Sequence, residues 1–165
     1  MHGVAFARLS DGRVAARGTA REMAYYRTGG RLDGRVAVAS LYPEVGTGYG
    51  TFGEMLLTAP RVEGDLGNKR GNASGGVTFH ASRGDQGTTD RVFWDGPADR
   101  LSGDRRVDAQ GPGYAVHSQG FSARADGSDV TLTGGVAGTL EPTGDPAPQP
   151  TANRQPASRK RAESR

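Results

Sequence analysis

The chain has 165 residues, of which 34% are hydrophobic and 27 are glycine, and it contains no cysteine. This length corresponds to one domain, and the glycine content disfavours a helical bundle, because glycine costs about 1 kcal/mol relative to alanine inside a helix. The absence of cysteine excludes disulfides and thiolate metal sites. The formal charge of +3 comes from the end of the chain: residues 1–143 carry 16 basic and 16 acidic side chains, whereas residues 144–165 carry five and two. A neutral body argues against nucleic-acid binding, which needs clustered basic side chains.

The chain opens without a recognisable targeting signal. Met1–Val4 lacks both the charged and the apolar region of an export signal. No later stretch approaches the roughly 20 apolar residues that cross a bilayer. We therefore expect no signal or anchor segment in this sequence, and a truncated start stays open.

Short apolar runs separated by turn residues make up the body of the chain. Asp11-Gly12, Gly29-Gly30 and Asp126-Gly127 each lie between two such runs, which is a strong β-hairpin signal. Alternation with a period of two is clearest in Val77-Thr78-Phe79-His80-Ala81, whose odd-numbered residues share one face. The sequence therefore predicts an all-β fold.

Residues Gly48-Tyr49-Gly50-Thr51-Phe52-Gly53 match the G-x-G-x-x-G pattern of dinucleotide-binding folds. Those folds place a helix directly after the glycines. Pro60 leaves no room for that helix. We interpret the segment as a glycine-rich loop between strands and expect no nucleotide cofactor.

A spacing of 15 residues recurs three times along the chain. It separates Val62 from Val77, Val92 from Val107, and Phe121 from Val136. The three pairs begin 30 and then 29 residues apart, and a turn-rich stretch lies inside each pair. Two short strands of such a unit cannot bury their apolar face alone, so neighbouring units must stack. An ordinary β-sandwich with regularly spaced turns is the alternative.

No group of residues points to catalysis or to a metal. Val116-His117-Ser118-Gln119-Gly120 is similar to a nucleophile elbow, but valine replaces its first glycine. The three histidines lack the short spacing of a metal site, and most carboxylates stand at turns, where they cap backbone N–H groups. We expect no catalytic residue, metal or cofactor. An enzyme acting on carbohydrate is an alternative that two carboxyl groups about 5–10 Å apart in a cleft would favour.

The large apolar side chains are too few to fill a closed interior, so many inward positions must be alanine, glycine, threonine or serine. This composition fits an open β-sleeve whose interior accepts an apolar chain. Alternation, extended by the repeat, predicts which side chains face inward and bind lipid. They are Val77, Phe79, Val92, Trp94, Phe121, Val130 and Leu132.

The composition changes near Thr143. Residues 143–165 contain four prolines and the basic run Arg159-Lys160-Arg161, with almost nothing apolar to bury. Such a segment cannot offset the entropy lost on ordering. The sequence therefore predicts a β-domain over residues 1–142 and a disordered, Pro-rich basic tail over residues 143–165.

A cadence recurs through the β-domain: a threonine-rich strand, an aromatic-Asp turn and a G-x-V strand. It is carried by Thr58–Asp65, Gly75–Phe79, Gly87–Asp95, Asp104–Val107, Gly120–Arg124 and Leu132–Val136. In this cadence, residues 58–140 resemble the LptC and LptA (OstA-like) family of lipopolysaccharide-export proteins. Residues 20–42 resemble the first strand pair of that family more loosely.

The resemblance implies a twisted, open β-jellyroll: a V-shaped half-pipe of mainly antiparallel strands built from roughly 30-residue repeats. It also implies a non-enzymatic protein that binds lipopolysaccharide and passes lipid A acyl chains along an apolar trough. The implied partners, joined by edge-strand pairing, are an LptA-like periplasmic protein and an inner-membrane ABC transporter of the LptB/LptF/LptG type. The implied location is the periplasm, tied to the inner membrane.

The chain departs from the family at both ends. LptC-like proteins usually begin with a membrane-spanning helix and LptA-like ones with a cleaved signal, and neither is visible here. The Pro-rich tail also lies outside the family pattern. The alternative hypothesis is a structural β-solenoid or adhesin-like module that binds protein and no lipid, with an interior filled by its own side chains.

Overall fold

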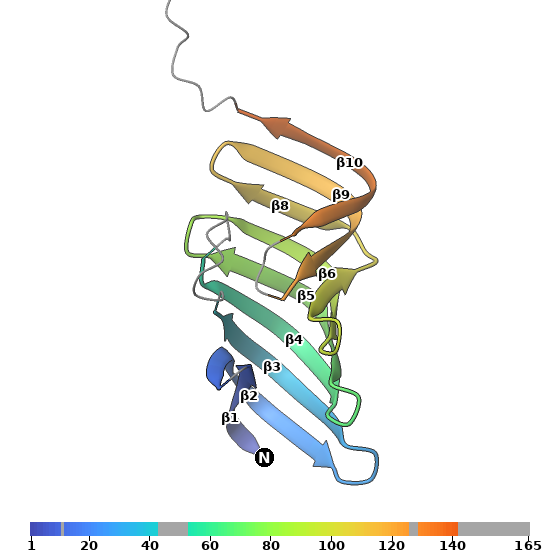
Figure 1. The fold of residues 1–165 in the computed structure, drawn as a ribbon. Helices are drawn as coiled ribbons and strands as arrows, with labels where there is room; N and C mark the ends of the chain where they lie inside the picture. The colour runs from blue at the N-terminus through green and yellow to red at the C-terminus, as the bar shows by residue number, and fades with distance from the viewer. Residues whose placement is uncertain (11, 43–52, 126–128, 142–165) are drawn as a thin grey trace, which may run out of the picture.

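The structure, a computed structural model, describes residues 1–10, 12–42, 53–125 and 129–141. No helix among these residues is long and apolar enough to cross a membrane. The predicted tail and nearly all of the Gly48–Gly53 motif lie outside the described residues, so the division at residue 142 stays a prediction. The strands (Figure 1) are β1 (His2–Ser10), β2 (Arg13–Tyr26), β3 (Arg31–Leu41), β4 (Met55–Asp65), β5 (Arg70–Ala81), β6 (Gln86–Asp95), β7 (Arg100–Gly103), β8 (Val107–Gly111), β9 (Tyr114–Arg124) and β10 (Thr131–Leu140).

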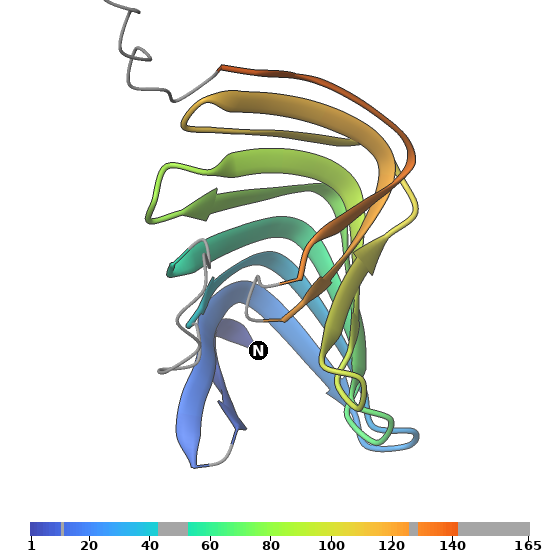
Figure 2. The same cartoon turned by 45° about the horizontal axis from the view of Figure 1, so that its top comes forward.

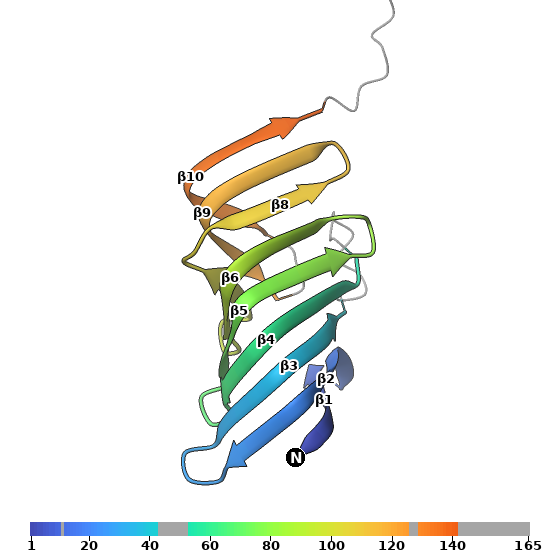
Figure 3. The same cartoon turned by 180° about the vertical axis from the view of Figure 1, so that it is seen from behind.

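All ten strands belong to one sheet, and every strand pair is antiparallel. The spatial order follows the chain, except that β7 and β8 together take one place between β6 and β9. The sheet therefore begins at β1 and ends at β10, as the views from both sides show (Figures 1 and 3). The predicted all-β fold of antiparallel strands is confirmed.

The sheet is bent into a V (Figure 2). The strand register shifts between Thr58 and Arg61 in β4, between Ser74 and Val77 in β5, and between Thr133 and Val136 in β10. At two of these places lie the glycine pairs Gly75-Gly76 and Gly134-Gly135, all four with positive φ, a conformation that glycine adopts without steric cost. Extra residues of this kind form β-bulges, which bend a strand and increase its twist.

The bend divides the sheet into two arms. The first arm contains residues 77–81 of β5 and 86–89 of β6, and the second arm contains residues 70–74 of β5 and 91–95 of β6. The long strands cross from one arm to the other, whereas β7 lies only in the second arm and β8 only in the first. The V-shaped half-pipe that the family resemblance implies is therefore present.

A row of small side chains runs along the inside of the bend, across seven strands. Successive members are cross-strand partners, except for Ala59 and Val77, which meet at the register shift and share one buried cluster. None of the seven is more than 8% exposed. We call this set the corner row, and it consists of Ala20, Ala37, Ala59, Val77, Thr89, Val107 and Ser118. The two arms converge at this line, and close packing there favours small side chains.

The predicted 30-residue repeat corresponds to successive hairpins. Val62 and Val77 lie in β4 and β5, Val92 and Val107 in β6 and β8, and Phe121 and Val136 in β9 and β10. In each pair the first residue stands in the second arm beside the bend, and the second stands at or next to the corner row. The spacing of 15 residues is therefore the path from one arm around the hairpin turn and back to the bend.

Aromatic rings of the sheet lie over cross-strand glycines. The pairs are Phe79 with Gly87, Trp94 with Gly71, and Phe121 with Gly103. A Cβ atom added to Gly87 would lie 2.5 Å from the Phe79 ring, and one added to Gly103 would lie 2.5 Å from the Phe121 ring. The ring thus fills the space that a side chain would take, an arrangement that compensates for the weak packing of glycine in a strand.

We predict that Gly87→Ala destabilises the protein by about 1–3 kcal/mol, the usual cost of overpacking. Besides the Phe79 ring, the added methyl group would meet the carbonyl oxygen of Asp108 at 2.6 Å, and that backbone atom cannot rotate away. The matched control is Gly64→Ala, because a Cβ atom there meets nothing closer than 3.6 Å and φ is not positive. The control should be neutral or slightly stabilising. Denaturant unfolding of both variants measures the difference, and equal midpoints would contradict the prediction.

Candidate functional site

The candidate site is the concave face of the V, the face that the two arms turn toward each other. On the first arm this face carries Leu57, Phe79, Ala109 and Val116. On the second arm it carries Val62, Ala73, Val92, Trp94, Leu101, Phe121, Ala123 and Leu132. Near the bend the two sets meet in one cluster, in which Leu57 of the first arm and Leu101 of the second pack against buried Ala59, Val77 and Val92.

A contact between the two arms shows which face of the sheet is the concave one. Arg8 of β1 pairs through its backbone with Ala16 of the first arm. Its guanidinium carbon lies 5.2 Å from the centre of the Trp94 ring, and its Nη2 donates a hydrogen bond of 3.0 Å to Asp99 Oδ1. Trp94 and Asp99 stand at the end of the second arm. Arg8 and Trp94 can meet only if both face the space between the arms.

The concave face is only partly buried. Ten apolar residues of the described chain are buried, and six of them are alanine. No large side chain of the described residues is fully buried, and Phe79, Trp94 and Phe121 keep part of their surface exposed. Small residues thus take the closed corner, whereas the larger ones stay accessible. A ligand that covered them would remove apolar surface from water, which is favourable.

Six of the seven predicted lipid-binding side chains lie on this face. Val77 and Val92 are buried beside the bend, at 3% and 8% exposure, and the other residues of the six are partly buried. They are Phe79, Trp94, Phe121 and Leu132. Val130 differs: β10 begins only at Thr131, and Val130 precedes it with 44% of its surface exposed. Lipid binding by these residues stays a prediction.

Sequence reasoning missed several residues of the concave face, among them Leu57, Val62 and Leu101. The reason is the bend, because a bulge changes which residues share a face. Ala59 and Val62 both join the buried cluster although they are three residues apart, a spacing that strict alternation places on opposite faces. Pro60 between them is the signal that could have located the bulge, since proline in a strand is confined to edges, first positions and bulges.

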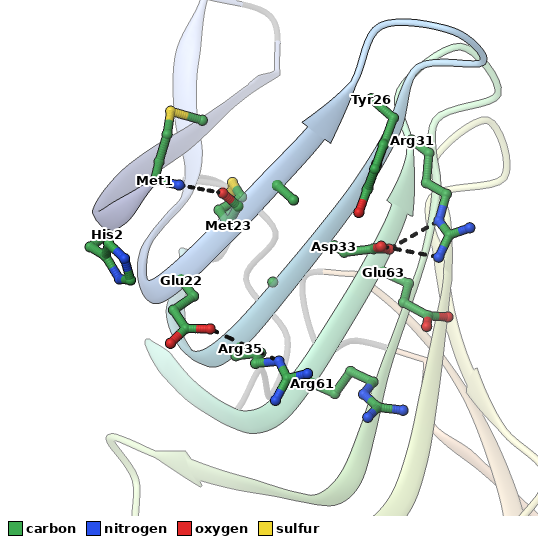
Figure 4. Close-up of a pocket in the computed structure, with 12 residues that line it drawn as sticks. Met1, His2, Glu22, Met23, Tyr26, Arg31, Asp33, Arg35, Arg61 and Glu63 are labelled. Carbon is green, nitrogen blue, oxygen red and sulfur yellow. Dashed lines mark hydrogen bonds and ion pairs between the residues drawn. The ribbon is translucent and has the colours of Figure 1, made fainter.

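A separate pocket lies near the N-terminus on the second arm and is lined mainly by charged side chains (Figure 4). Arg31 donates from Nε and Nη2 to the Asp33 carboxylate at 3.0 Å, and these bonds raise the pKa of Arg31. Arg35 lies 4.0 Å from Glu22. Exposed pairs of this kind are typical of a solvated sheet surface. Glu22, Asp33 and Glu63 line the pocket, and Asp33 and Glu63 are cross-strand partners. The carbohydrate-enzyme alternative stays a hypothesis.

Tyr114 and Asp85 form a short polar contact on the first arm. The Tyr114 hydroxyl donates to Asp85 Oδ1 at 2.7 Å, and partial burial followed by this hydrogen bond raises the pKa of the tyrosine. The bond joins the start of β9 to the turn before β6. No cluster of three or more metal-ligating side chains exists within the described ranges. As a part-buried hydrogen bond, the Tyr114–Asp85 contact stabilises the end of the arm.

Comparison with known proteins bears on the fold. No protein family and no curated protein matches the sequence of this chain. Among solved structures, the chain is similar to LptH, the LptA homologous periplasmic component of the conserved lipopolysaccharide transport device from Pseudomonas aeruginosa. The TM-score is 0.56 and the identity 11%, over 77% of this chain and 95% of LptH. The chain therefore has the β-jellyroll fold of an LptA homologue.

Proposed function

We propose that this protein is a non-enzymatic, lipopolysaccharide-binding component of an export bridge across the cell envelope. It receives lipid A acyl chains on the concave face and passes them along the V between an inner-membrane ABC transporter and the next periplasmic jellyroll. The fold of LptH supports the general role in lipopolysaccharide transport. The binding of lipid A by the concave face is our inference from its side chains.

The observation that carries the proposal is the partial burial of the large apolar side chains between the arms. Phe79, Trp94 and Phe121 are held over glycines rather than packed in a closed core. Each methylene group that an acyl chain buries against them is worth about 0.8 kcal/mol. Because this interaction has no preferred direction, a chain can slide from hairpin to hairpin without breaking hydrogen bonds.

The two ends of the sheet are the proposed contacts with neighbouring proteins. β1 and β10 each pair on one side only, and a free strand edge can add a strand from another protein. Residues 1–35 carry seven basic and three acidic side chains, whereas residues 85–142 carry five basic and nine acidic ones. The β1 end of the sheet is thus richer in basic side chains than the half of the sheet that ends at β10, and this difference distinguishes the two edges. We assign these edges to an LptA-like protein and to a transporter of the LptB/LptF/LptG type.

These partners imply a location in the periplasm, tied to the inner membrane through the transporter. LptH is itself described as a periplasmic component. The assignment rests on that fold relationship and on the proposed partners.

We predict that photo-reactive residues at positions 79 and 94 crosslink to lipopolysaccharide. Phe79 and Trp94 lie on the concave face, so an acyl chain bound there contacts them. The matched controls are their neighbours Thr78 and Phe93, which face the opposite side of the sheet. Labelling from the controls alone would place the lipid on the outer face. The absence of labelling at all four positions would favour the protein-binding module without a lipid ligand.

We also predict that Leu140→Pro weakens binding at the β10 edge and leaves the fold intact. The N–H of Glu141 bonds to the Gly113 carbonyl at 2.7 Å and therefore points to β9. Since N–H directions alternate along a strand, the N–H of Thr139 also points to β9 and that of Leu140 points to the free edge. Proline at 140 removes only the edge donor.

The control for this prediction is Thr139→Pro, which removes a hydrogen bond to β9 and should lower the unfolding free energy. Surface plasmon resonance with the LptA-like neighbour measures the affinity, and thermal unfolding measures the stability. We expect Leu140→Pro to lose about tenfold in affinity, the equivalent of one hydrogen bond of about 1.4 kcal/mol. Unchanged affinity in that variant would exclude the β10 edge as the binding surface.

A further inference from the structure

Arg8 makes the longest-range contact of the concave face. It belongs to the first strand of the sheet, and its ion-pair partner Asp99 lies 91 residues later, in the turn between β6 and β7. In the strand order, four strands stand between β1 and β6. The contact therefore reaches over the space between the arms rather than along a pair of neighbouring strands. The side chains of Arg8 and Asp99 are 32% and 35% exposed, so water or a ligand can reach the ion pair and separate it.

Asp99 is bound by two arginines from different strands. Its Oδ1 accepts from Arg8 at 3.0 Å, and its Oδ2 accepts from Arg124 of β9 at 3.4 Å. The carboxylate that Arg8 binds is therefore shared with a second guanidinium group. Guanidinium groups match the geometry of phosphate as well as that of carboxylate, and a phosphate brings more charge and more acceptor oxygens. A phosphate group would therefore bind the Arg8 guanidinium more tightly than the Asp99 carboxylate does.

Trp94 adds an apolar surface and a free donor to the same place. Its ring lies beneath the Arg8 guanidinium, 5.2 Å from it, and on its other neighbour strand it covers Gly71. The indole Nε1 is buried, and no hydrogen-bond partner for it exists among the described residues. A buried donor without a partner destabilises a protein unless an acceptor reaches it. From Trp94 the apolar surface continues through its cross-strand partner Leu101.

We infer that Arg8 is a binding site for the anionic headgroup of an amphiphile, and that Asp99 occupies this site in the free protein. The ligand class is a phosphorylated lipid: its phosphate replaces the Asp99 carboxylate on Arg8, and its acyl chains lie along the concave side chains beyond Trp94. Asp99 thereby acts as an internal competitor. The inference rests on the proposed function and names the group through which the lipid headgroup is recognised.

The test is a titration of the full chain and two variants, Asp99→Asn and Arg8→Gln. Trp94 is the only tryptophan of the chain, so its fluorescence reports binding at the site itself. The probes are bisphosphorylated lipid A and the same lipid after removal of both phosphates. We expect Asp99→Asn to raise the affinity for bisphosphorylated lipid A about tenfold and Arg8→Gln to lower it about tenfold. Neither variant should change the affinity for the dephosphorylated lipid by more than about twofold.

Opposite effects of two substitutions at one ion pair separate this role from a structural one. If both variants bind the two lipids with the same altered affinity, the ion pair only holds the arms together and the inference is wrong. If inorganic phosphate alone changes Trp94 fluorescence at the concentrations at which lipid A does, the ligand is a free anion and the lipid assignment is wrong. If the unmodified chain binds neither lipid, the proposed function itself fails.

A second arginine variant keeps the test independent of folding. Arg8→Lys retains the charge and loses the planar pair of donors, so it should bind bisphosphorylated lipid A with an affinity between those of the unmodified chain and Arg8→Gln. Circular dichroism shows whether each variant keeps its strands. If Arg8→Gln does not fold, the increase in Asp99→Asn, which leaves Arg8 in place, decides the outcome, and an unchanged or lower affinity there would overturn the inference.

Discussion

The bend of the sheet is the constraint on which the rest of the structure depends. The corner row follows one line across seven strands, and its side chains must be small because the two arms converge there. The corner row meets this requirement with alanine, valine, threonine and serine. Glycine pairs and a proline on individual strands supply the bulges that allow the backbone to bend. A large side chain in the corner row would force the arms apart.

The same constraint leaves the protein without a closed core. Small residues occupy the corner, where the two arms are closest. The larger side chains therefore pack outside the corner, over glycines of neighbouring strands. This packing holds each ring in place from one side and leaves part of the ring exposed, although Arg8 lies over the Trp94 ring. The packing of large aromatic rings over glycines therefore does two things. It stabilises the sheet, and it leaves apolar surface on the concave face for a ligand.

Much of the fold could be predicted from the sequence because its signals are local. Asp-Gly and Gly-Gly pairs stand in the sequence between strands that pair with each other, and the 15-residue spacing of Val62 and Val77 follows from the length of one hairpin. The position of Phe79 follows from alternation within one arm. Alternation fails where a bulge intervenes, as between Ala59 and Val62. Arg8 could not be linked to Asp99, because nothing local in a sequence encodes a contact between residues 91 positions apart.

The hairpin construction has a consequence for how such a molecule can change in length. Each of the last three hairpins brings its own stretch of the bend, and each carries one large residue seated on a glycine, Phe79, Trp94 or Phe121. Adding or deleting one hairpin would therefore lengthen or shorten the concave face by a fixed step, and β1 and β10 would remain the terminal strands. The length of the sheet is therefore set by the number of hairpins, and evolution can change that number without altering either terminal strand.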